Sequence, residues 1–381
     1  MNQAIVVLTP SGLRLARRYR DAGPVSAAIF APSAILGSLD EAKPGPIAAT
    51  FEAAEPGEYA WLGPLRAIVP GLWEWSDAIV AVMALGIVVR LVGPLARDKR
   101  SDPAVVVVDE AGRFAIATLG GHASGANALA LEVAAILGAQ AVVTTASDSA
   151  GLPAVDQVGR AEGWTIERAE NLTRVAAAVV RREVVAVYQD AGSPDWWRRF
   201  GGWPGHFRRL SSWDAVRGSS PAAILAISDR AIPEGLPTDR VLVYRPPTLV
   251  AGIGCRRGTA RVAIEAWVGQ VFREHGLAEA SLAALATVML KIDEPGLLEF
   301  ARSRSLPLVA FPSEQLASQP GIERPSARVF DKVGLYAVAE PSALRAAGAG
   351  RLLLPKQKGP GITLALARHP SDRAGPAAYC E

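Results

Sequence analysis

The sequence predicts an α/β protein of several domains, with mostly parallel sheets flanked by helices and a separate C-terminal α/β domain. Short apolar runs alternate with segments of helical spacing, as in βαβ units, and 381 residues exceed the usual size of one domain. A proline pair within 245–247 precedes a fresh strand and has the composition of a linker. We therefore expect an N-terminal α/β domain with a glycine–histidine loop over 1–145, a divergent middle region over 146–246 and a C-terminal α/β domain over 247–370.

Composition narrows the class of protein. Hydrophobic residues make up 50% of the chain and charged residues 20%, so the chain can bury a core. The net charge is only +3, from 40 basic and 37 acidic residues, which gives no sign of a nucleic-acid partner. The two cysteines, Cys255 and Cys380, form no disulfide framework, so the cytoplasm is the expected compartment. The apolar run 78–89 is too short to span a membrane, and the N-terminus lacks the pattern of a signal peptide.

The first domain is predicted to begin with a strand over 4–8 and an amphipathic helix over 11–21. A helix from Gly86 is bent or ended by Pro94, and a second helix covers 126–137. Buried strands are expected at 78–82, 104–108, 114–119 and 140–145. The alternation of these elements favours a mostly parallel sheet.

The stretch TLGGHASGAN, residues 118–127, stands between a predicted strand and a predicted helix. Paired glycines at such a junction let the backbone turn and approach a large ligand, and a helix start offers free N–H groups to its oxygens. His122 carries the side chain best able to move protons near neutral pH. The following strand ends in TTASDSAGLPAVD. If the two strands are parallel, His122 and Asp148 lie at the same carboxyl edge, where open α/β sheets bind ligands.

The middle region is harder to interpret. Strand-like runs occur at 184–188 and 222–227. Four tryptophans stand among glycines and prolines, for which we favour a local core under long loops: Trp196, Trp197, Trp203 and Trp213.

The C-terminal domain is predicted to open with a strand from Leu249, the glycine loop GIGCRRGT and a helix over 259–275. This loop is only a weak relative of the dinucleotide fingerprint, because its last glycine comes one position late. A strand over 286–290 delivers Lys291, and Asp293 is a plausible N-cap of the next helix. A strand over 306–311 follows, and the segment RLLLPKQKGPGITLALAR is typical of a hairpin.

Taken together, these motifs resemble the cobalt-precorrin-5A hydrolase family (CbiG) of anaerobic cobalamin biosynthesis. The matching pieces, in the family's order, are ALGIVVR, PLARDKRSDPAVVVVDEAGRF, GGHASGAN, TTASDSAGLPAVD, GIGCRRGT, LKIDEPGLLEFA, GLYAVAEPSAL and KQKGPGITLALAR. The resemblance covers nearly the whole chain and is weakest over about 150–245. In one departure, Ser124 and Gly125 stand where the family shows a second glycine pair; a serine fits a helix start, so we expect the loop to survive.

The resemblance implies a two-part hydrolysis. Water opens the δ-lactone of a ring-contracted cobalt tetrapyrrole, and a two-carbon fragment then leaves as acetaldehyde. It implies no cofactor of the enzyme, because the cobalt belongs to the substrate. Apart from that tetrapyrrole, we expect no nucleic-acid or membrane partner, and at most a homodimer or transient contact with neighbouring pathway enzymes.

Lactone opening needs a base for water, donors for the oxyanion and a proton source. We assign the base to His122, helped by Asp148, the oxyanion donors to the backbone around Gly120 and Gly121, and proton shuttling to Glu294 with Lys291. Each of the three acid–base side chains has a structural alternative: a loop histidine, a turn-capping aspartate and one half of a surface ion pair with Lys291. Candidate substrate-binding residues come from the glycine loops and from cations suited to carboxylates. They are Gly120, Gly121, Gly125, Asn127, Arg90, Lys99, Thr144, Thr145, Gly252, Gly254, Lys291 and Lys356.

The spacing of His206, His275, His369 and the cysteines predicts no metal site. Two other functions stay open: a non-catalytic protein that hands tetrapyrrole intermediates over within the pathway, and a phosphate-binding α/β enzyme. The second lacks a GxxxxGK[ST] motif. We further expect the substrate to lie in a cleft between the N-terminal and C-terminal domains, because both offer glycine loops.

Overall fold

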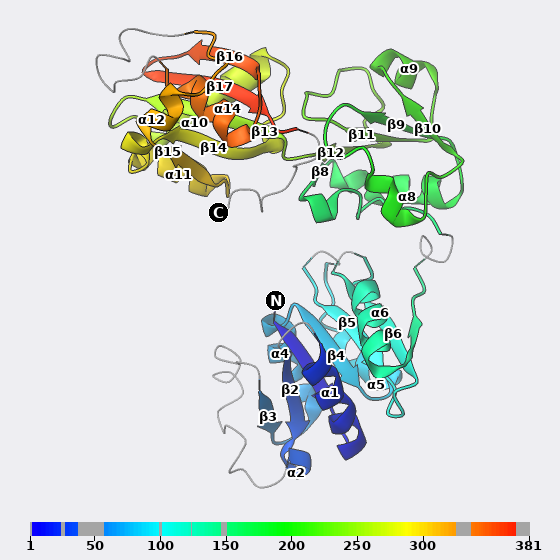
Figure 1. The fold of residues 1–381 in the computed structure, drawn as a ribbon. Helices are drawn as coiled ribbons and strands as arrows, with labels where there is room; N and C mark the ends of the chain where they lie inside the picture. The colour runs from blue at the N-terminus through cyan, green and yellow to red at the C-terminus, as the bar shows by residue number, and fades with distance from the viewer. Residues whose placement is uncertain are drawn as a thin grey trace. The chain divides into compact units, whose positions relative to one another are not determined.

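The computed structural model describes residues 2–23, 27–36, 57–98, 101–122, 124–145, 151–324 and 337–370. The chain divides into two compact units, Met1–Ala154 and Val155–Glu381. The first unit holds one sheet and the second holds two, each flanked by helices (Figure 1). The predicted α/β class with mostly parallel sheets is confirmed.

The sheet of the first unit has seven strands in the order β3-β2-β1-β4-β5-β6-β7. They are β1 (Gln3–Val7), β2 (Ala27–Pro32), β3 (Glu58–Trp61), β4 (Ala78–Val82), β5 (Ala104–Val108), β6 (Phe114–Leu119) and β7 (Gln140–Val142). All neighbouring strands are parallel except β5 and β6. Because β6 runs against β5, the carboxyl end of β6 lies at the edge where β4 and β5 begin.

Helices cover both faces of this sheet, which explains why the central strands β4 and β5 are apolar throughout. The helices are α1 (Pro10–Ala22), α2 (Ser33–Leu36), α4 (Val69–Trp75), α5 (Leu85–Val92) and α6 (Ala126–Leu137), with a 3₁₀ turn η1 (Leu65–Ala67). Buried side chains of α1 and α6 pack with Ile5 and Val7, whereas those of α4 and α5 pack with Ala4 and Val6 on the other face. Thr9 is the N-cap of helix α1, and its hydroxyl accepts a hydrogen bond from Gly12 N.

The middle sheet has the order β10-β9-β11-β12-β8, parallel except for the edge strand β8. Its strands are β8 (Thr165–Glu167), β9 (Val185–Gln189), β10 (Phe207–Leu210), β11 (Ala223–Ile227) and β12 (Val241–Arg245). Its helices are α8 (Leu172–Val180) and α9 (Trp213–Gly218), with 3₁₀ turns η2 (Arg160–Glu162), η3 (Ala169–Asn171) and η4 (Trp196–Phe200). The two predicted strand runs are β9 and β11.

The third sheet has the order β15-β14-β13-β17-β16. Its strands are β13 (Leu249–Cys255), β14 (Leu282–Val288), β15 (Leu308–Phe311), β16 (Leu352–Lys358) and β17 (Ile362–Arg368). Its helices and turns are α10 (Arg261–Glu274), η5 (Glu279–Ser281), η6 (Met289–Lys291), α11 (Pro295–Ser303), α12 (Ser313–Ala317) and α14 (Ala339–Ala347). Helices α10 and α11 pack on one face and α14 on the other, and β16 and β17 form the predicted hairpin (Figure 1).

Three sequence expectations need correction. Strand β14 ends at Val288, so Lys291 stands on the 3₁₀ turn η6 and not directly after a strand. Glu294, not Asp293, is the N-cap residue of α11. The stretch 245–247 is not an exposed linker: Arg245 is 4% exposed and its guanidinium donates to backbone carbonyls of the middle domain.

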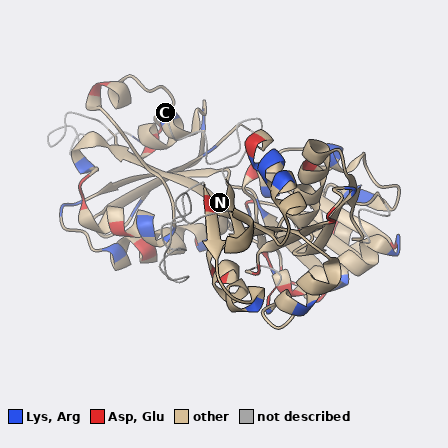
Figure 2. Ribbon diagram, turned by 90° about the horizontal axis from the view of Figure 1, so that it is seen from below, with Lys and Arg blue, Asp and Glu red and all other residues tan. Residues whose placement is uncertain are grey.

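Charged residues of both signs are interspersed over the described elements (Figure 2), in line with the nearly balanced composition. Within the described part of the chain, none of the helices is both long and apolar enough to cross a membrane.

Candidate functional site

The glycine–histidine loop between β6 and α6 is closed by its own backbone. Ser124 N donates to Gly120 O at 2.8 Å, and Asn127 N donates to Gly121 O at 3.1 Å. Gly120 (φ +86°) and Gly125 (φ +90°) occupy the left-handed region that favours glycine. A Cβ on Gly120 would also lie 2.8 Å from that of Ser124. The tight turn therefore explains why Gly120 and Gly125 are glycines. A Cβ on Gly121 would have its nearest neighbour at 3.8 Å, so packing does not require glycine there.

Side chains fasten this loop to two neighbouring segments. Ser124 Oγ donates to Asp102 O at 2.6 Å, and Asp102 Oδ2 accepts a hydrogen bond from Arg97 N. On the other side, Asn127 Nδ2 donates to Thr145 Oγ1 at 2.7 Å. The loop, the connection before β5 and the end of β7 therefore meet at one edge of the sheet. Ser124 is accommodated as expected, because its hydroxyl supplies one of these bonds.

Of the remaining candidate residues in the first unit, some lie within the described part of the chain and others do not. His122 is half-buried in the loop, and Thr144 is exposed after β7, which is parallel to β6 as the prediction required. Arg90 is exposed, and its guanidinium donates to a carbonyl oxygen of its own helix, α5. Asp148 and Lys99 lie outside the described residues. The pairing of His122 with Asp148 stays a prediction.

A second polar cluster lies at the carboxyl edge of the C-terminal sheet. Lys291 Nζ and Glu294 Oε2 are 3.2 Å apart, with side chains only 15% and 6% exposed. Glu294 Oε1 accepts a hydrogen bond from Gly258 N at 3.3 Å. Burial raises the pKa of the nearby Cys255 thiol, with Lys291 lowering it and Glu294 raising it. The predicted ion pair therefore exists, but it is a largely buried pair and not a solvated one.

The surroundings of this cluster are both basic and apolar. Arg256, Arg257 and Lys358 are exposed at the same edge. Met289 and Leu290, which directly precede Lys291, are 48% and 53% exposed. Exposed apolar side chains beside cations suit a ligand with an apolar ring and carboxylate arms.

Lys356 has contacts of a different kind. It is 4% exposed, and its ammonium donates to Arg324 O. The fully buried carboxylate of Glu340 accepts from the backbone N–H groups of Glu323, Arg324 and Lys356. Burial lowers the pKa of Lys356, and Glu340 opposes that shift. These contacts favour a structural role for Lys356 over the predicted contact with substrate.

Close packing requires glycine at the two glycine positions of β13. A Cβ on Gly252 would overlap Ala339 O at the start of α14, and one on Gly254 would lie 2.7 Å from Thr363 Oγ1. The close approach of α14 and β17 thus explains these glycines without a bound dinucleotide. Their predicted contact with substrate remains untested.

Some polar partners were not predicted from the sequence. Gly258 N and the carbonyl of Asp102 come from segments far from Glu294 and Ser124 in the chain, and no local pattern marks such contacts. Cys255 could have been noticed within GIGCRRGT. Among the described residues, no group of three or more His, Cys, Asp and Glu side chains could hold a metal ion.

Glycine-rich loops and a buried Lys–Glu pair at the edges of mostly parallel sheets define an α/β enzyme with sites suited to an oxygen-rich ligand. Three family models divide the chain between them: Cobalamin synthesis G N-terminal over residues 67–148, the Cobalamin biosynthesis central region over 153–246 and Cobalamin synthesis G C-terminus over 249–367.

Similar individual proteins support the same family as these models. The chain is 39% identical over 312 residues to cobalt-precorrin-5A hydrolase of Priestia megaterium, covering 81% of this chain and 83% of that protein. It is 32% identical over 299 residues to the enzyme of the same name from Salmonella typhimurium, covering 76% and 81%. Protein CobE of Sinorhizobium sp. is 31% identical over 107 residues, 28% of this chain and 70% of CobE. The chain belongs to the cobalt-precorrin-5A hydrolase (CbiG) family, which confirms the resemblance of its motifs.

Proposed function

We propose that this protein hydrolyses cobalt-precorrin-5A in cobalamin biosynthesis, opening its δ-lactone and releasing acetaldehyde to give cobalt-precorrin-5B. The observation that carries the proposal is the 39% identity, over 81% of the chain, to a cobalt-precorrin-5A hydrolase. The hand-over alternative is not favoured, because the relatives that cover most of the chain bear the names of hydrolases. We propose no cofactor of the enzyme; the cobalt is part of the substrate.

For the first step we propose the glycine–histidine loop. His122 removes a proton from water as the oxygen attacks the lactone carbonyl, and the carbonyl electrons move onto the oxyanion. Backbone N–H groups of Gly120, Gly121 and the start of α6 stabilise that oxyanion. The acyl–oxygen bond then breaks, leaving a carboxylic acid, which ionises by losing its proton to solvent, and an alkoxide that takes a proton from His122. Asn127 supports this geometry, since its side chain bonds to Thr145 and its backbone to the loop.

In the second step the freed hydroxyl loses its proton, and its oxygen electrons form the aldehyde carbonyl. The carbon–carbon bond to the macrocycle breaks, its electrons pass to the conjugated ring system, and a proton completes the macrocyclic product. Asp148 or Glu294 is the proposed partner for these proton transfers. Glu294 is 5% exposed, and a buried carboxyl next to a lysine is a plausible site for moving a proton.

The C-terminal edge has a binding role in this proposal. Lys291, held by Glu294, pairs with a substrate carboxylate, and the exposed Met289 and Leu290 offer an apolar surface to the macrocycle. Arg256 and Arg257 are further candidates for the carboxylate arms.

The test is an anaerobic incubation of the purified protein with cobalt-precorrin-5A, in which acetaldehyde is assayed. Stoichiometric release that depends on enzyme is the expected result. Binding of the tetrapyrrole without acetaldehyde would favour the hand-over protein. Thermal stabilisation by ATP or NAD, with none by corrinoid intermediates, would favour the phosphate-binding alternative.

A further inference from the structure

The middle domain has the topology of a ligand-binding α/β domain. From β9 the chain passes outward to β10, returns to β11 on the other side of β9, and continues to β12. The direction of winding therefore changes between β9 and β11. Open α/β sheets bind ligands at such a switch point, outside the carboxyl ends of the strands.

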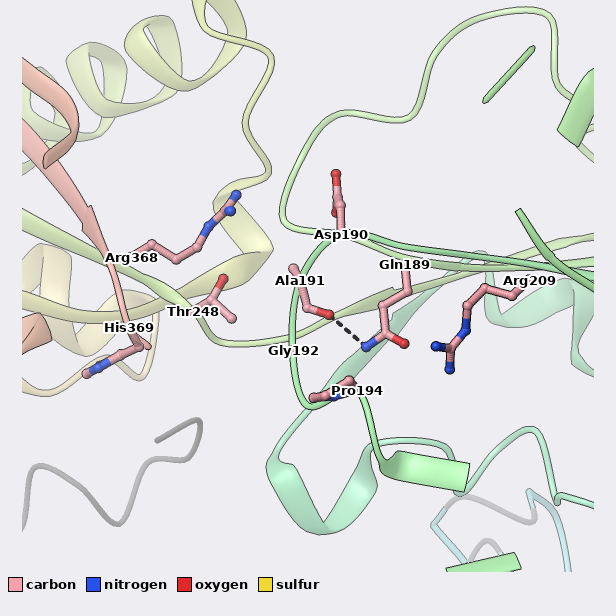
Figure 3. Close-up of a pocket in the computed structure, with 9 residues that line it drawn as sticks. All are labelled: Gln189, Asp190, Ala191, Gly192, Pro194, Arg209, Thr248, Arg368 and His369. Carbon is pink, nitrogen blue, oxygen red and sulfur yellow. Dashed lines mark hydrogen bonds between the residues drawn. The ribbon is translucent and has the colours of Figure 1, made fainter. Parts of the chain in front are cut away.

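A hollow of about 440 Å³ lies at that place. The last residue of β9, Gln189, and the segment that follows it to Pro194 form one wall (Figure 3). Arg209 of β10 extends from the same domain, and Thr248 and Arg368 stand on the C-terminal domain across from this segment. A switch point and a hollow with basic and hydroxyl side chains therefore coincide.

Hydrogen bonds and close packing brace the wall formed by residues 189–194. The amide of Gln189 donates to the carbonyls of Ala191 and Ser193, and its oxygen accepts from Trp196 Nε1. Gly192 has φ +72°, and a Cβ there would lie 2.6 Å from the ring of Trp164. These contacts brace the loop in the observed conformation, and such bracing favours binding because less order must be gained.

The tryptophan-rich patch positions one cation of the hollow. The guanidinium of Arg209 lies 4.8 Å from the ring centroid of Trp203. Trp203 in turn makes edge contacts with Trp196, Trp197 and Phe207. Arg209 forms no ion pair with any residue that the structure describes. A cation held over an aromatic cluster but not neutralised is available for an anion from solution.

The opposite wall is also fixed. Arg368 Nη2 lies 2.6 Å from Asp229 Oδ1, and Thr248 Oγ1 donates to Asp229 Oδ2 at 2.7 Å. Asp229 is fully buried. Within the described residues, Arg368 Nε and Asp190 Oδ1 are buried without a hydrogen-bond partner. Asp190 Oδ2 accepts a hydrogen bond from the Tyr188 hydroxyl at 3.2 Å and lies 3.8 Å from Arg230 Nε.

We propose that this hollow is a carboxylate-binding site, with Arg209 as the principal cation. A guanidinium matches a carboxylate with two parallel hydrogen bonds. Thr248 and Arg368, the latter already paired with Asp229, line the C-terminal side of the hollow. Two sources share this chemistry: a carboxylate arm of a tetrapyrrole, which rests on the proposed function, and a free small carboxylate, which does not.

The site is distinct from the Lys291–Glu294 cluster. Thr248 precedes β13, whereas Cys255, at the Lys291–Glu294 cluster, ends it. A strand of this length separates its two ends by roughly 20 Å. The carboxylate site is therefore at the opposite edge of the C-terminal sheet.

The test is isothermal titration of the full chain with two probes, uroporphyrin as a tetrapyrrole with acetate and propionate arms and citrate as a free carboxylate. Arg209→Gln is the test variant, and Arg208→Gln, exposed at the preceding position of β10, is the matched control. We expect at least one probe to bind. Its affinity should fall at least about tenfold in Arg209→Gln and change less than about twofold in Arg208→Gln.

Each result has a defined meaning. Binding of uroporphyrin alone assigns the site to a tetrapyrrole arm, and binding of citrate assigns it to a free carboxylate. No binding of either probe, or equal losses in both variants, would overturn the inference. The acetaldehyde assay is scored separately, so an inactive protein that still binds a carboxylate through Arg209 would refute only the proposed function.

Discussion

His122 is the one histidine of the chain within a glycine loop at a helix start, and the proposed reaction depends on it more than on any other side chain. His122→Asn should keep folding and substrate binding but slow acetaldehyde release by about 10²–10⁴-fold, the usual contribution of a general base. Single-turnover acetaldehyde assays measure this. His275→Asn, an exposed histidine at the end of α10, is the control. Release at the parental rate from the His122 variant would move the search for the base to Glu294.

Variants of Lys291 and Glu294 can distinguish a role in substrate binding from a role in protein stability. Lys291→Ala should raise KM more than it lowers kcat if Lys291 holds a substrate carboxylate. It also leaves a buried carboxylate without its cation, which costs on the order of 1–3 kcal/mol of unfolding free energy. The double variant with Glu294→Gln should recover stability but not KM, as urea unfolding and steady-state kinetics would measure. If KM recovered together with stability, Lys291 would have a structural role only.

The pH dependence of Cys255 alkylation reports on the Lys291–Glu294 cluster. Burial raises the pKa of its thiol above the ordinary 9.0, so alkylation by iodoacetamide should stay slow until the pH passes that value. Lys291 lowers this pKa, and Lys291→Ala should therefore shift the rate profile to higher pH. Because the folded pKa lies above the unfolded one, the associated stability is present below the unfolded pKa and is lost as pH rises through the folded pKa. An unshifted profile, measured in a Cys380→Ser background, would contradict the coupling.

At the scale of elements, the strands that helices cover on both faces were the most predictable. The predicted runs 78–82 and 104–108 coincide with β4 and β5, because double burial makes every position apolar. In contrast, β10 reads FRRL and lies at a sheet edge, where exposed arginines conceal it. Strand β14, rich in Ala and Leu, was misplaced because these residues favour helices over strands.

The candidate site was predictable where its contacts are local. The pair Lys291–Glu294 stands three residues apart on one turn, so its contact could be expected from spacing. The buried state of the pair could not, because it depends on Gly258 and Cys255, which the β13–α10 connection brings close. The hollow of the middle domain depends on strand order, which the sequence does not reveal.

The packing of α14 on β13 gives a test of an element contact. Gly252→Ala would place a methyl group on Ala339 O, a backbone atom that only a shift of the helix can move. We expect a loss of about 1–3 kcal/mol of unfolding free energy. Gly350→Ala, which meets nothing within 4 Å, should stay within about 0.5 kcal/mol of the parent. Equal stability of the two variants in urea unfolding would show that the sheet and the helix are not closely packed there.

At the scale of the whole molecule, the middle and C-terminal sheets behave as one packed unit. Residues 229–231 of the middle domain bond to 276–278 of the C-terminal domain through Ala278 N to Asp229 O, Ala231 N to Gly276 O and an isolated bridge. The buried Asp229 joins Arg368 to Thr248. The connection between the two sheets is therefore part of a core, although its proline pair has the composition of an exposed linker.

This packing predicts how the unit comes apart. Asp229→Ala removes a fully buried carboxylate and leaves Arg368 and Thr248 without their partner, which should cost on the order of 3 kcal/mol of unfolding free energy. Local opening should then expose 241–250, so thermolysin should cleave between β12 and β13 in the variant and leave the parent intact there. Asp239→Ala, which removes exposed pairs with Arg174 and Arg240, is the control and should change stability by less than about 0.5 kcal/mol. Cleavage of the parent protein at 241–250 under the same conditions would mean that the two sheets are joined by a flexible linker after all.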